Sequence, residues 1–475
     1  EDPTLTDEVD ARIDEGATAE WAVHDAFAGF RATLEAVGGY LGERAADLDD
    51  IAQRVLARLQ GVAAPGVPDP GHPFVLVARD LAPADTALLK LDQVLALVTS
   101  DGGPTSHTAI LAREKGIVAI VGAADAAALA DGTTVIVDAA AGTVNDSPTS
   151  EELGAVAERI ASRAAEDARP AGPGALADGT PISLLANLGK PADAADAVAR
   201  GAEGVGLFRT EFLFLGASQA PTIEQQRAAY VELLGAFEGR KVVVRLLDAG
   251  ADKPLAFLND AHEENPALGL RGLRALRASE DILREQLTAL AEADAATAAD
   301  LWVMAPMVTT VEETAYFTAL AKEFGLKTAG VMVEVPASAL LADRVLAHAD
   351  FASIGTNDLT QYTMAADRLL GSVAGFQDPW HPAVLRLVRE VGEAGARLGK
   401  PVGICGEAAA DPLLAVVLVG LGATSLSMAP SALSDVRRSI SQHTLEDARR
   451  IAASALLADD AAGARAAAKS AASAH

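Results

Sequence analysis

The stretch GGPTSHTAILAREKG, residues 102–116, places a histidine where it could act as a nucleophile. It runs from an apolar strand through a glycine turn into a predicted helix that begins near Ser106. At a helix entrance, His107 would face unpaired backbone N–H groups and the positive end of the helix dipole, which disfavour the imidazolium form. A neutral ring nitrogen can accept a phosphoryl group, and the N–H groups can then hold it. An ordinary alternative stays open, in which Ser106 is a helix N-cap and His107 is solvated.

Polar side chains also gather where short apolar strands are predicted to end. They are Asn187, Arg209, Arg245, Glu334, Asn357, Asp358, Cys405 and Glu407. In a barrel of parallel strands, this rim is where catalytic groups lie. On spacing alone other interpretations remain, with Glu334 and Asp358 as salt-bridge partners of the arginines and Cys405 as a small buried hydrophobe.

The strands that would position this rim recur from about residue 180 onward, each followed by helix-compatible sequence. They are ISLLANL, GVGLFRT, VVVRLLD, LWVMAPM, AGVMVEV, FASIGTN, VGICGEA and SLSMAPS. Eight strand–helix units in roughly 300 residues predict an α/β fold with a (β/α)8 (TIM) barrel. A doubly wound open sheet is the alternative.

The rest of the chain is predicted to form smaller parts. We expect a helical subdomain at 1–62, a β/α domain with four short strands at 63–148, a linker helix at 149–178 and the barrel at 179–475. Pro/Gly-rich stretches mark the boundaries. The alanine-rich tail from residue 453 is expected to be a fraying helix.

Composition narrows the class of protein further. The chain contains 66 Asp and Glu residues and 38 Lys and Arg residues, which gives a net charge of −28. This charge works against non-specific nucleic-acid binding. An anionic ligand must therefore meet a local basic cluster. No apolar run is long enough for a membrane span, and one cysteine excludes an intramolecular disulfide and fits the cytoplasm.

The segment GGPTSHTAILAREKGIVAIVG resembles the phosphohistidine segment of the phosphoenolpyruvate-using (PEP-utilising) phosphotransferases. This family includes enzyme I of the bacterial sugar phosphotransferase system, PEP synthase and pyruvate phosphate dikinase. GVGLFRTEFLF, VVVRLLDAGADKP, EENPALGLRGLR, VMVEVPASAL, FASIGTNDLTQYTMAADR and GICGEAAAD resemble its PEP-binding barrel, in family order. Thr108 is similar to enzyme I, because the dikinases usually have alanine there, whereas Pro104 stands where arginine is frequent.

The resemblance implies a role for each matched residue. It implies that His107 is phosphorylated and that Cys405 donates a proton to the enolate of pyruvate. It implies a swivelling phosphohistidine domain at 63–148, and Mg²⁺ held by Glu334 and Asp358. The substrate-binding residues that it implies are Arg209, Arg245, Arg271, Asn357, Asp358 and Arg368.

The same resemblance implies the partners: PEP and pyruvate, the carrier protein HPr, and a second copy of the chain in a homodimer formed by the barrel domain. Relative to enzyme I, the chain opens inside the HPr-docking helical part, so an N-terminal shortening is expected. Two alternatives remain. A dikinase or PEP synthase would need an ATP-binding domain, for which no segment is large enough, and a non-catalytic PEP sensor would not need the intact rim.

Overall fold

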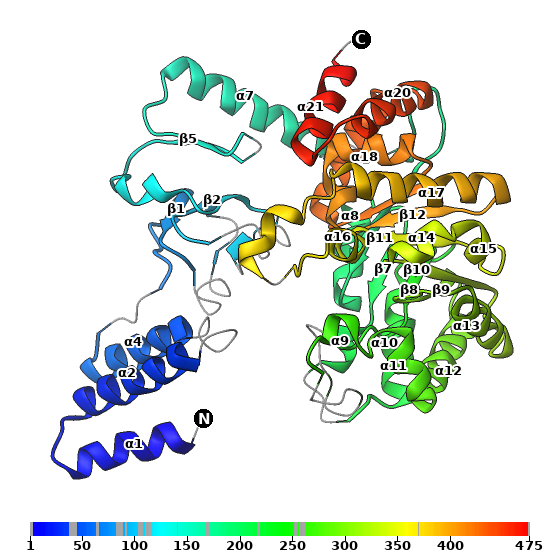
Figure 1. The fold of residues 1–475 in the computed structure, drawn as a ribbon. Coiled ribbons are helices and arrows are strands. Elements are labelled where there is room, and N and C mark those ends of the chain that lie inside the picture. Colours follow the sequence, from blue (N-terminus) through cyan, green and yellow to red (C-terminus); the bar gives the residue numbers. More distant parts are fainter. Residues whose placement is uncertain are drawn as a thin grey trace. The chain divides into compact units, whose positions relative to one another are not determined.

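A computed structural model describes the protein, and Figure 1 shows its ribbon. The chain divides into two compact units, Glu1–Leu153 and Gly154–His475. The described residues are 3–37, 45–62, 66–81, 89–90, 93–102, 108–109, 112, 116–139, 141–167, 172–215, 219–250, 255, 258, 263–368 and 370–473. Within these ranges, no helix is long and apolar enough to cross a membrane.

Helices open the first unit, as the apolar spacing of three and four residues predicts. They are α1 (Pro3–Asp14), α2 (Ala19–Val37) and α4 (Ala45–Gln60). α2 and α4 pack together through Val23, Phe27 and Ala52, which are buried in one small cluster. The opposite faces carry exposed side chains, Trp21 among them, so each helix is amphipathic.

Two small sheets follow in the same unit. β1 (Phe74–Ala78), β2 (Val94–Thr99) and β3 (Val118–Ile120) form a parallel sheet in that order, and the 3₁₀ helix η1 (Ala124–Ala128) follows. β4 (Ile136–Asp138) pairs antiparallel with β5 (Thr143–Asn145). The four predicted strands are present. β5 has three residues and no apolar pattern, so the sequence does not predict it.

The linker segment contains helix α7 (Ser150–Asp167). Thr149 begins it with a reciprocal cap: its N–H donates to Glu152 Oε2 at 2.7 Å, and the N–H of Glu152 donates to Thr149 Oγ1 at 3.3 Å. This pairing of Thr with Glu three residues later is the capping box that marks a helix start in sequence. The domain limits drawn from the sequence stay predictions.

Eight parallel strands of the second unit close into a barrel, as predicted, so the open-sheet alternative is wrong. The strands are β6 (Ser183–Leu188), β7 (Val205–Arg209), β8 (Lys241–Arg245), β9 (Asp300–Ala305), β10 (Thr328–Val333), β11 (Ala352–Gly355), β12 (Val402–Cys405) and β13 (Ser425–Met428). β13 pairs with β6 and closes the ring. Because strand side chains alternate, one set faces the helices and the other fills the interior. The interior cluster contains Leu207, Val243, Met304, Met332, Phe351 and Cys405.

Helices surround these strands (Figure 1). Those longer than two turns include α10 (Ile223–Gly235), α12 (Glu280–Ala296), α13 (Val311–Glu323), α16 (Thr356–Met364), α17 (Pro382–Leu398), α18 (Pro412–Gly420) and α19 (Leu433–Ser441). Shorter ones are α8 (Ala194–Ala199), α9 (Glu211–Phe214), α11 (Leu273–Ala278), α14 (Pro336–Leu340) and α15 (Ala342–Leu346). Short 3₁₀ helices are η2 (Pro191–Asp193), η3 (Pro266–Leu268), η4 (Gly371–Phe376), η5 (Glu407–Ala410) and η6 (Pro430–Ala432).

The alanine-rich tail is not the fraying helix that the sequence suggests. It contributes to two ordered helices, α20 (Leu445–Leu456) and α21 (Ala461–Ala472). Ala455, Ala464 and Ala468 are buried in the barrel unit's main core, and Asp460 caps α21 through the N–H of Gly463. Small side chains let the two helices approach closely, so this stretch packs without large apolar residues.

We predict that Gly392→Ala destabilises the barrel unit, because an added Cβ in α17 would lie 2.0 Å from the carbonyl oxygen of Leu421. Overpacking of this kind costs about 2 kcal/mol in the free energy of unfolding. Gly235→Ala is the matched control, since an added Cβ there meets nothing within 4 Å. Urea unfolding followed by circular dichroism measures both, and equal stabilities would contradict the packing described here.

Candidate active site

The carboxyl ends of the barrel strands carry most of the predicted site residues. Arg209 and Arg245 end β7 and β8 and pair in register across the two strands. Glu334 directly follows β10, and Cys405 ends β12. Because the strands are parallel, their carboxyl ends meet at one edge of the barrel. The predicted rim is therefore present.

Arg245 lies inside a buried group of carboxylates. The residue is 5% exposed, and its Nη2 donates to Oε1 of Glu211. Its Nη1 lies 3.4 Å from Oδ2 of Asp248 and 3.6 Å from Oε1 of Glu334. Burial works to lower the pKa of Arg245, but these three carboxylates and that of Asp358 outweigh burial and raise that pKa. The barrel mouth thus keeps a permanent cation.

Two further arginines reach the rim from loops rather than from strands. Arg271 Nη2 donates to Oδ2 of Asp248 at 2.9 Å, and Arg271 Nη1 donates to Oδ1 of Asp358 at 3.0 Å. Arg368 Nη1 donates to the other oxygen of Asp358 at 3.2 Å. Burial again opposes the charged form of Arg271, yet Asp248 and Asp358 raise its pKa. Planar guanidinium groups held this way suit a substrate with both a carboxylate and a phosphate.

Glu334 and Asp358 bring two carboxyl groups close together. Glu334 is 1% exposed, and burial, followed by the charge of Asp358, raises the pKa of Glu334 to about 8. Its Oε2 accepts the N–H of Met307 at 3.0 Å. Gly355 makes room for the carboxylate, because a Cβ there would lie 2.7 Å from Cγ of Glu334. This pair of hard oxygen ligands fits a divalent cation that keeps water or substrate oxygens as its other ligands.

Cys405 lies beneath the arginines at the end of β12. It is 1% exposed, and burial raises the pKa of its thiol to about 11, although a hydrogen bond from Ser353 opposes the shift. Ser353 Oγ donates to the sulfur at 3.3 Å, and the thiol donates to the carbonyl of Ile354 at 3.4 Å. The thiol therefore stays protonated at neutral pH, as a proton donor must.

Asn357 and Arg209 lie at the more open part of the rim, and both are half-buried. Asn357 is in the first turn of α16, directly before Asp358, and its Oδ1 accepts the N–H of Glu407 at 3.4 Å. Arg209 comes close enough to the thiol of Cys405 for its charge to favour the thiolate slightly. The structure thus brings Arg209, Arg245, Arg271, Glu334, Asn357, Asp358, Arg368 and Cys405 to one barrel mouth.

His107 lies outside the described residues. Beside it, Thr108 and Ala109 are helical and buried. Thr108 Oγ1 donates to Oδ1 of Asp80 at 3.0 Å, and the same carboxylate oxygen accepts the N–H of Leu81 at 2.8 Å. Thr108 is therefore fixed to the segment that follows β1, and the role of His107 stays a prediction.

The sequence prediction missed several residues of the rim. Asp248 ends the quoted segment VVVRLLD, so the rule that finds strand-end polar residues would have found it too. Glu211 lies within FRTEFLF, where apolar neighbours signal its burial. Tyr362 in α16 accepts from Arg271 Nη1 at 3.2 Å and donates to the carbonyl of Ala267 in η3, a long-range contact that no local pattern encodes.

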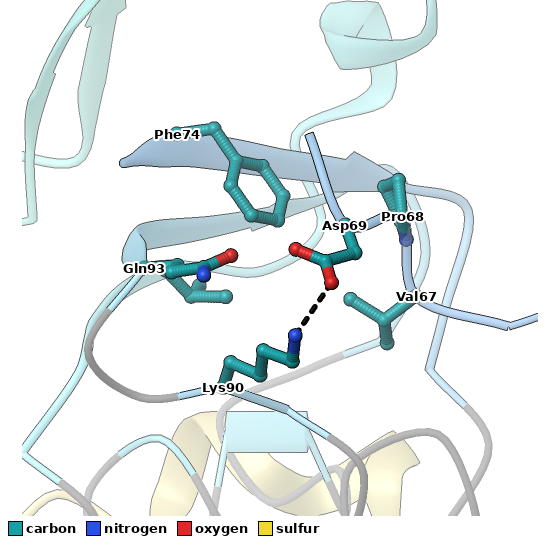
Figure 2. A pocket seen from close by; sticks show the side chains of 7 residues that line it. Val67, Pro68, Asp69, Phe74, Lys90 and Gln93 are labelled. Atoms are coloured by element: carbon teal, nitrogen blue, oxygen red, sulfur yellow. Dashed lines mark hydrogen bonds and ion pairs between the residues drawn. The ribbon is translucent and has the colours of Figure 1, made fainter. Parts of the chain in front are cut away.

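A small pocket in the first unit is a separate feature (Figure 2). Lys90 pairs with Asp69 across it, and the hydrogen bond and charge of Lys90 lower the pKa of that exposed carboxyl. Figure 2 shows the ring of Phe74 and the amide of Gln93 facing the same space. One exposed ion pair beside apolar side chains gives no catalytic arrangement, so the candidate site remains the barrel rim.

The chain forms a parallel (β/α)8 barrel, and buried arginines face carboxylates at its carboxyl rim, above a protonated thiol. This combination is typical of an enzyme that acts on a small anion. The chain belongs to the PEP-utilising enzyme family. The family's PEP-binding domain matches residues 163–445, its mobile domain 70–142 and its N-terminal domain 1–44. The family resemblance seen in the sequence is confirmed.

Three similar proteins are each called phosphoenolpyruvate-protein phosphotransferase. The one from Streptomyces coelicolor is 53% identical over 99% of this chain and 85% of its own length. The one from Haloferax volcanii is 42% identical over 96% of this chain and 83% of its own length. The one from a Bacillus species is 40% identical over 95% of this chain and 81% of its own length. The similarity thus extends through the barrel and the segments before it.

We predict that Cys405 resists alkylation in the folded chain. With a pKa of about 11, about one thiol in a thousand is ionised at pH 8, and the thiolate is the reactive form. Alkylation by iodoacetamide should be on the order of a hundredfold slower than in the urea-unfolded chain and should accelerate with pH until the pH approaches the thiol pKa of about 11. Intact-mass measurement suffices, because Cys405 is the single cysteine. Equal folded and unfolded rates would contradict the buried thiol.

Proposed function

We propose that this chain transfers the phosphoryl group of PEP to His107, releases pyruvate, and passes the phosphoryl group to a histidine of the carrier protein HPr. The observation that supports this most is the buried rim in which Arg245 and Arg271 face Glu334 and Asp358. PEP carries a carboxylate and a phosphate, so an acidic protein can bind it only where fixed cations are concentrated.

In this proposal Arg245, Arg271 and Arg368 bind the two anionic groups of PEP. Arg271 and Arg368 already share Asp358, so a phosphate placed between them would meet donors that need little reorganisation. Arg209 and the side-chain amide of Asn357, on the more open part of the rim, contact the phosphate from the other side. The neutral imidazole of His107 is the nucleophile.

Glu334 and Asp358 would hold Mg²⁺, which when bound supplies positive charge for the phosphate and the enolate oxygen. Across the described residues, no three acidic, histidine or cysteine side chains converge as a metal site. The two carboxylates therefore suit a cation whose remaining ligands are water and substrate. Breaking the bond from phosphorus to oxygen leaves the enolate of pyruvate, whose charge the arginines stabilise.

Cys405 completes the reaction in this proposal. Its S–H bond breaks as a C–H bond forms at C3 of the enolate, which gives the methyl group of pyruvate and leaves the electron pair on sulfur. The buried thiol donates to the carbonyl of Ile354 before the reaction, so its proton is held inside the barrel.

We further propose a cytoplasmic homodimer, with the helices of residues 3–60 contributing to HPr binding.

Labelling with PEP tests the phosphoryl acceptor. The chain incubated with phosphorus-labelled PEP and Mg²⁺ should take up one acid-labile phosphate, and His107→Ala should take up none. Because the histidine rather than a carboxylate carries the group, the label should survive alkali. Stoichiometric labelling of His107→Ala would refute the assignment, and labelling from ATP would instead favour a dikinase. Transfer of the label to added HPr tests the second half of the proposal.

We predict that Glu334→Gln weakens divalent-cation binding by at least about tenfold, because the amide loses the negative charge that the ion needs. Mn²⁺, which takes the same hard oxygen ligands, reports binding through its paramagnetic resonance signal without any need for turnover. Glu203→Gln is the matched control: Glu203 pairs with Arg437 and lies two residues before β7, at the amino ends of the strands. Equal Mn²⁺ affinity in both variants would exclude Glu334 as a ligand.

A further inference from the structure

One layer of the barrel interior is made of hydroxyl groups and glycine. Four neighbouring strands contribute Ser353, Gly403, Ser425 and Ser183, and register pairing joins each to the next. Their chain neighbours Ile354, Ile404, Leu426 and Leu184 belong to the main core beneath the helices. Because strand residues alternate, the serines and the glycine face the inside of the barrel. Barrel interiors are normally filled by bulky branched side chains, so a polar layer calls for an explanation.

Gly403 leaves space in this layer. A Cβ on Gly403 would lie 2.9 Å from Oγ of Ser425 and 3.7 Å from Oγ of Ser353, so the glycine separates two hydroxyls that both point toward it. Gly403 keeps partial solvent exposure although Val402 and Ile404 on either side are fully buried. Its exposed surface therefore faces the barrel interior, where a water molecule would find polar partners.

This layer lies directly below the thiol of Cys405. Cys405 is two residues after Gly403 on β12, and Ser353 Oγ donates its hydrogen to Sγ at 3.3 Å. Ser353 is 5% exposed, so bulk solvent does not reach the sulfur past it. The hydroxyl thus stands between the thiol and the space beside Gly403.

We propose that Ser353 positions the thiol of Cys405 and, with water held beside Gly403 and Ser425, returns a proton to the sulfur after each turnover. The proposal rests on the proposed function, in which Cys405 gives its proton to C3 of the enolate. The thiolate then takes the proton of the Ser353 hydroxyl, and Ser353 recovers one from the water, which is resupplied by solvent. One proton enters from solvent for each pyruvate formed, and no other reactant is consumed.

Isotope exchange at equilibrium separates this step from phosphoryl transfer and needs no carrier protein. The full chain is incubated with PEP, radiolabelled pyruvate and Mg²⁺ in heavy water. Movement of carbon label into PEP counts reversals of the phosphoryl transfer. Deuterium at C3 of pyruvate counts only those reversals in which the proton on Cys405 has exchanged with solvent, because otherwise the same proton returns.

In Ser353→Ala we expect the deuterium uptake per carbon exchange to fall on the order of tenfold, the factor that a lost hydrogen bond to an ionised group is worth. Ser353→Thr keeps the hydroxyl and should restore the ratio. Gly403→Ala fills the water space and should lower the ratio as well. Ser427→Ala is the matched control: Ser427 is a buried barrel serine in register with Cys405, but its hydroxyl donates to the carbonyl of Ala186 at 3.1 Å.

Iodoacetamide supplies a second readout on the same variants. Ser353→Ala enlarges the space around the sulfur, so a purely steric role predicts faster alkylation of Cys405. Loss of the hydrogen bond that stabilises the thiolate predicts slower alkylation, on the order of tenfold at pH 9. Faster alkylation in Ser353→Ala would overturn the positioning role.

An unchanged deuterium ratio in Ser353→Ala, with carbon exchange intact, would overturn the proton route and leave the proposed function standing. If Ser353→Ala does not fold by circular dichroism, Gly403→Ala and Ser425→Ala decide by the same criterion. Absence of carbon exchange in the unmodified chain would refute the proposed function, and the proton route with it.

Discussion

The site depends on the burial of guanidinium groups at the mouth of a barrel. Removing an ion from water costs several kcal/mol, and only well-placed opposite charges offset that cost. Glu211, Asp248 and Asp358 supply those charges for Arg245 and Arg271, and each carboxylate comes from the segment that follows a different barrel strand. An acidic protein thereby keeps a small region where anions are stabilised. The barrel strands fix the positions of the segments that carry these charged side chains.

Much of this arrangement could be read from the sequence because buried parallel strands leave a strong signal. Short apolar runs such as AGVMVEV and FASIGTN end in polar residues, and parallel strands bring those ends together. Arg271 and Arg368 reach the same place from loops, so strand pattern alone does not find them, and only the family resemblance does. Glu211 and Ser353 could not be assigned, because their importance lies in partners that are distant in the chain. The ordered tail was misjudged because close packing of alanine leaves no large apolar residues to count.

The polarity of the barrel interior changes along the barrel axis. Ion pairs occupy the carboxyl end, and the thiol of Cys405 and the side chain of Met332 lie beneath them. A layer of three serine hydroxyls and one glycine follows, contributed by four neighbouring strands. The thiol raises no desolvation problem in its neutral form, which is why it can lie under a cluster of charges. Each layer therefore has a polarity suited to its contents: charges where anions are bound, a neutral acid where carbon is protonated, and hydroxyls where water can be held.

The pairing of β13 with β6 has a consequence for how the chain is made. These two strands are the last and the first of the ring, separated by most of the second unit. During synthesis, both edges of the sheet from β6 to β12 stay unpaired until β13 (Ser425–Met428) has emerged from the ribosome. The nascent second unit is consequently open to edge-to-edge aggregation until its last barrel strand is available to pair.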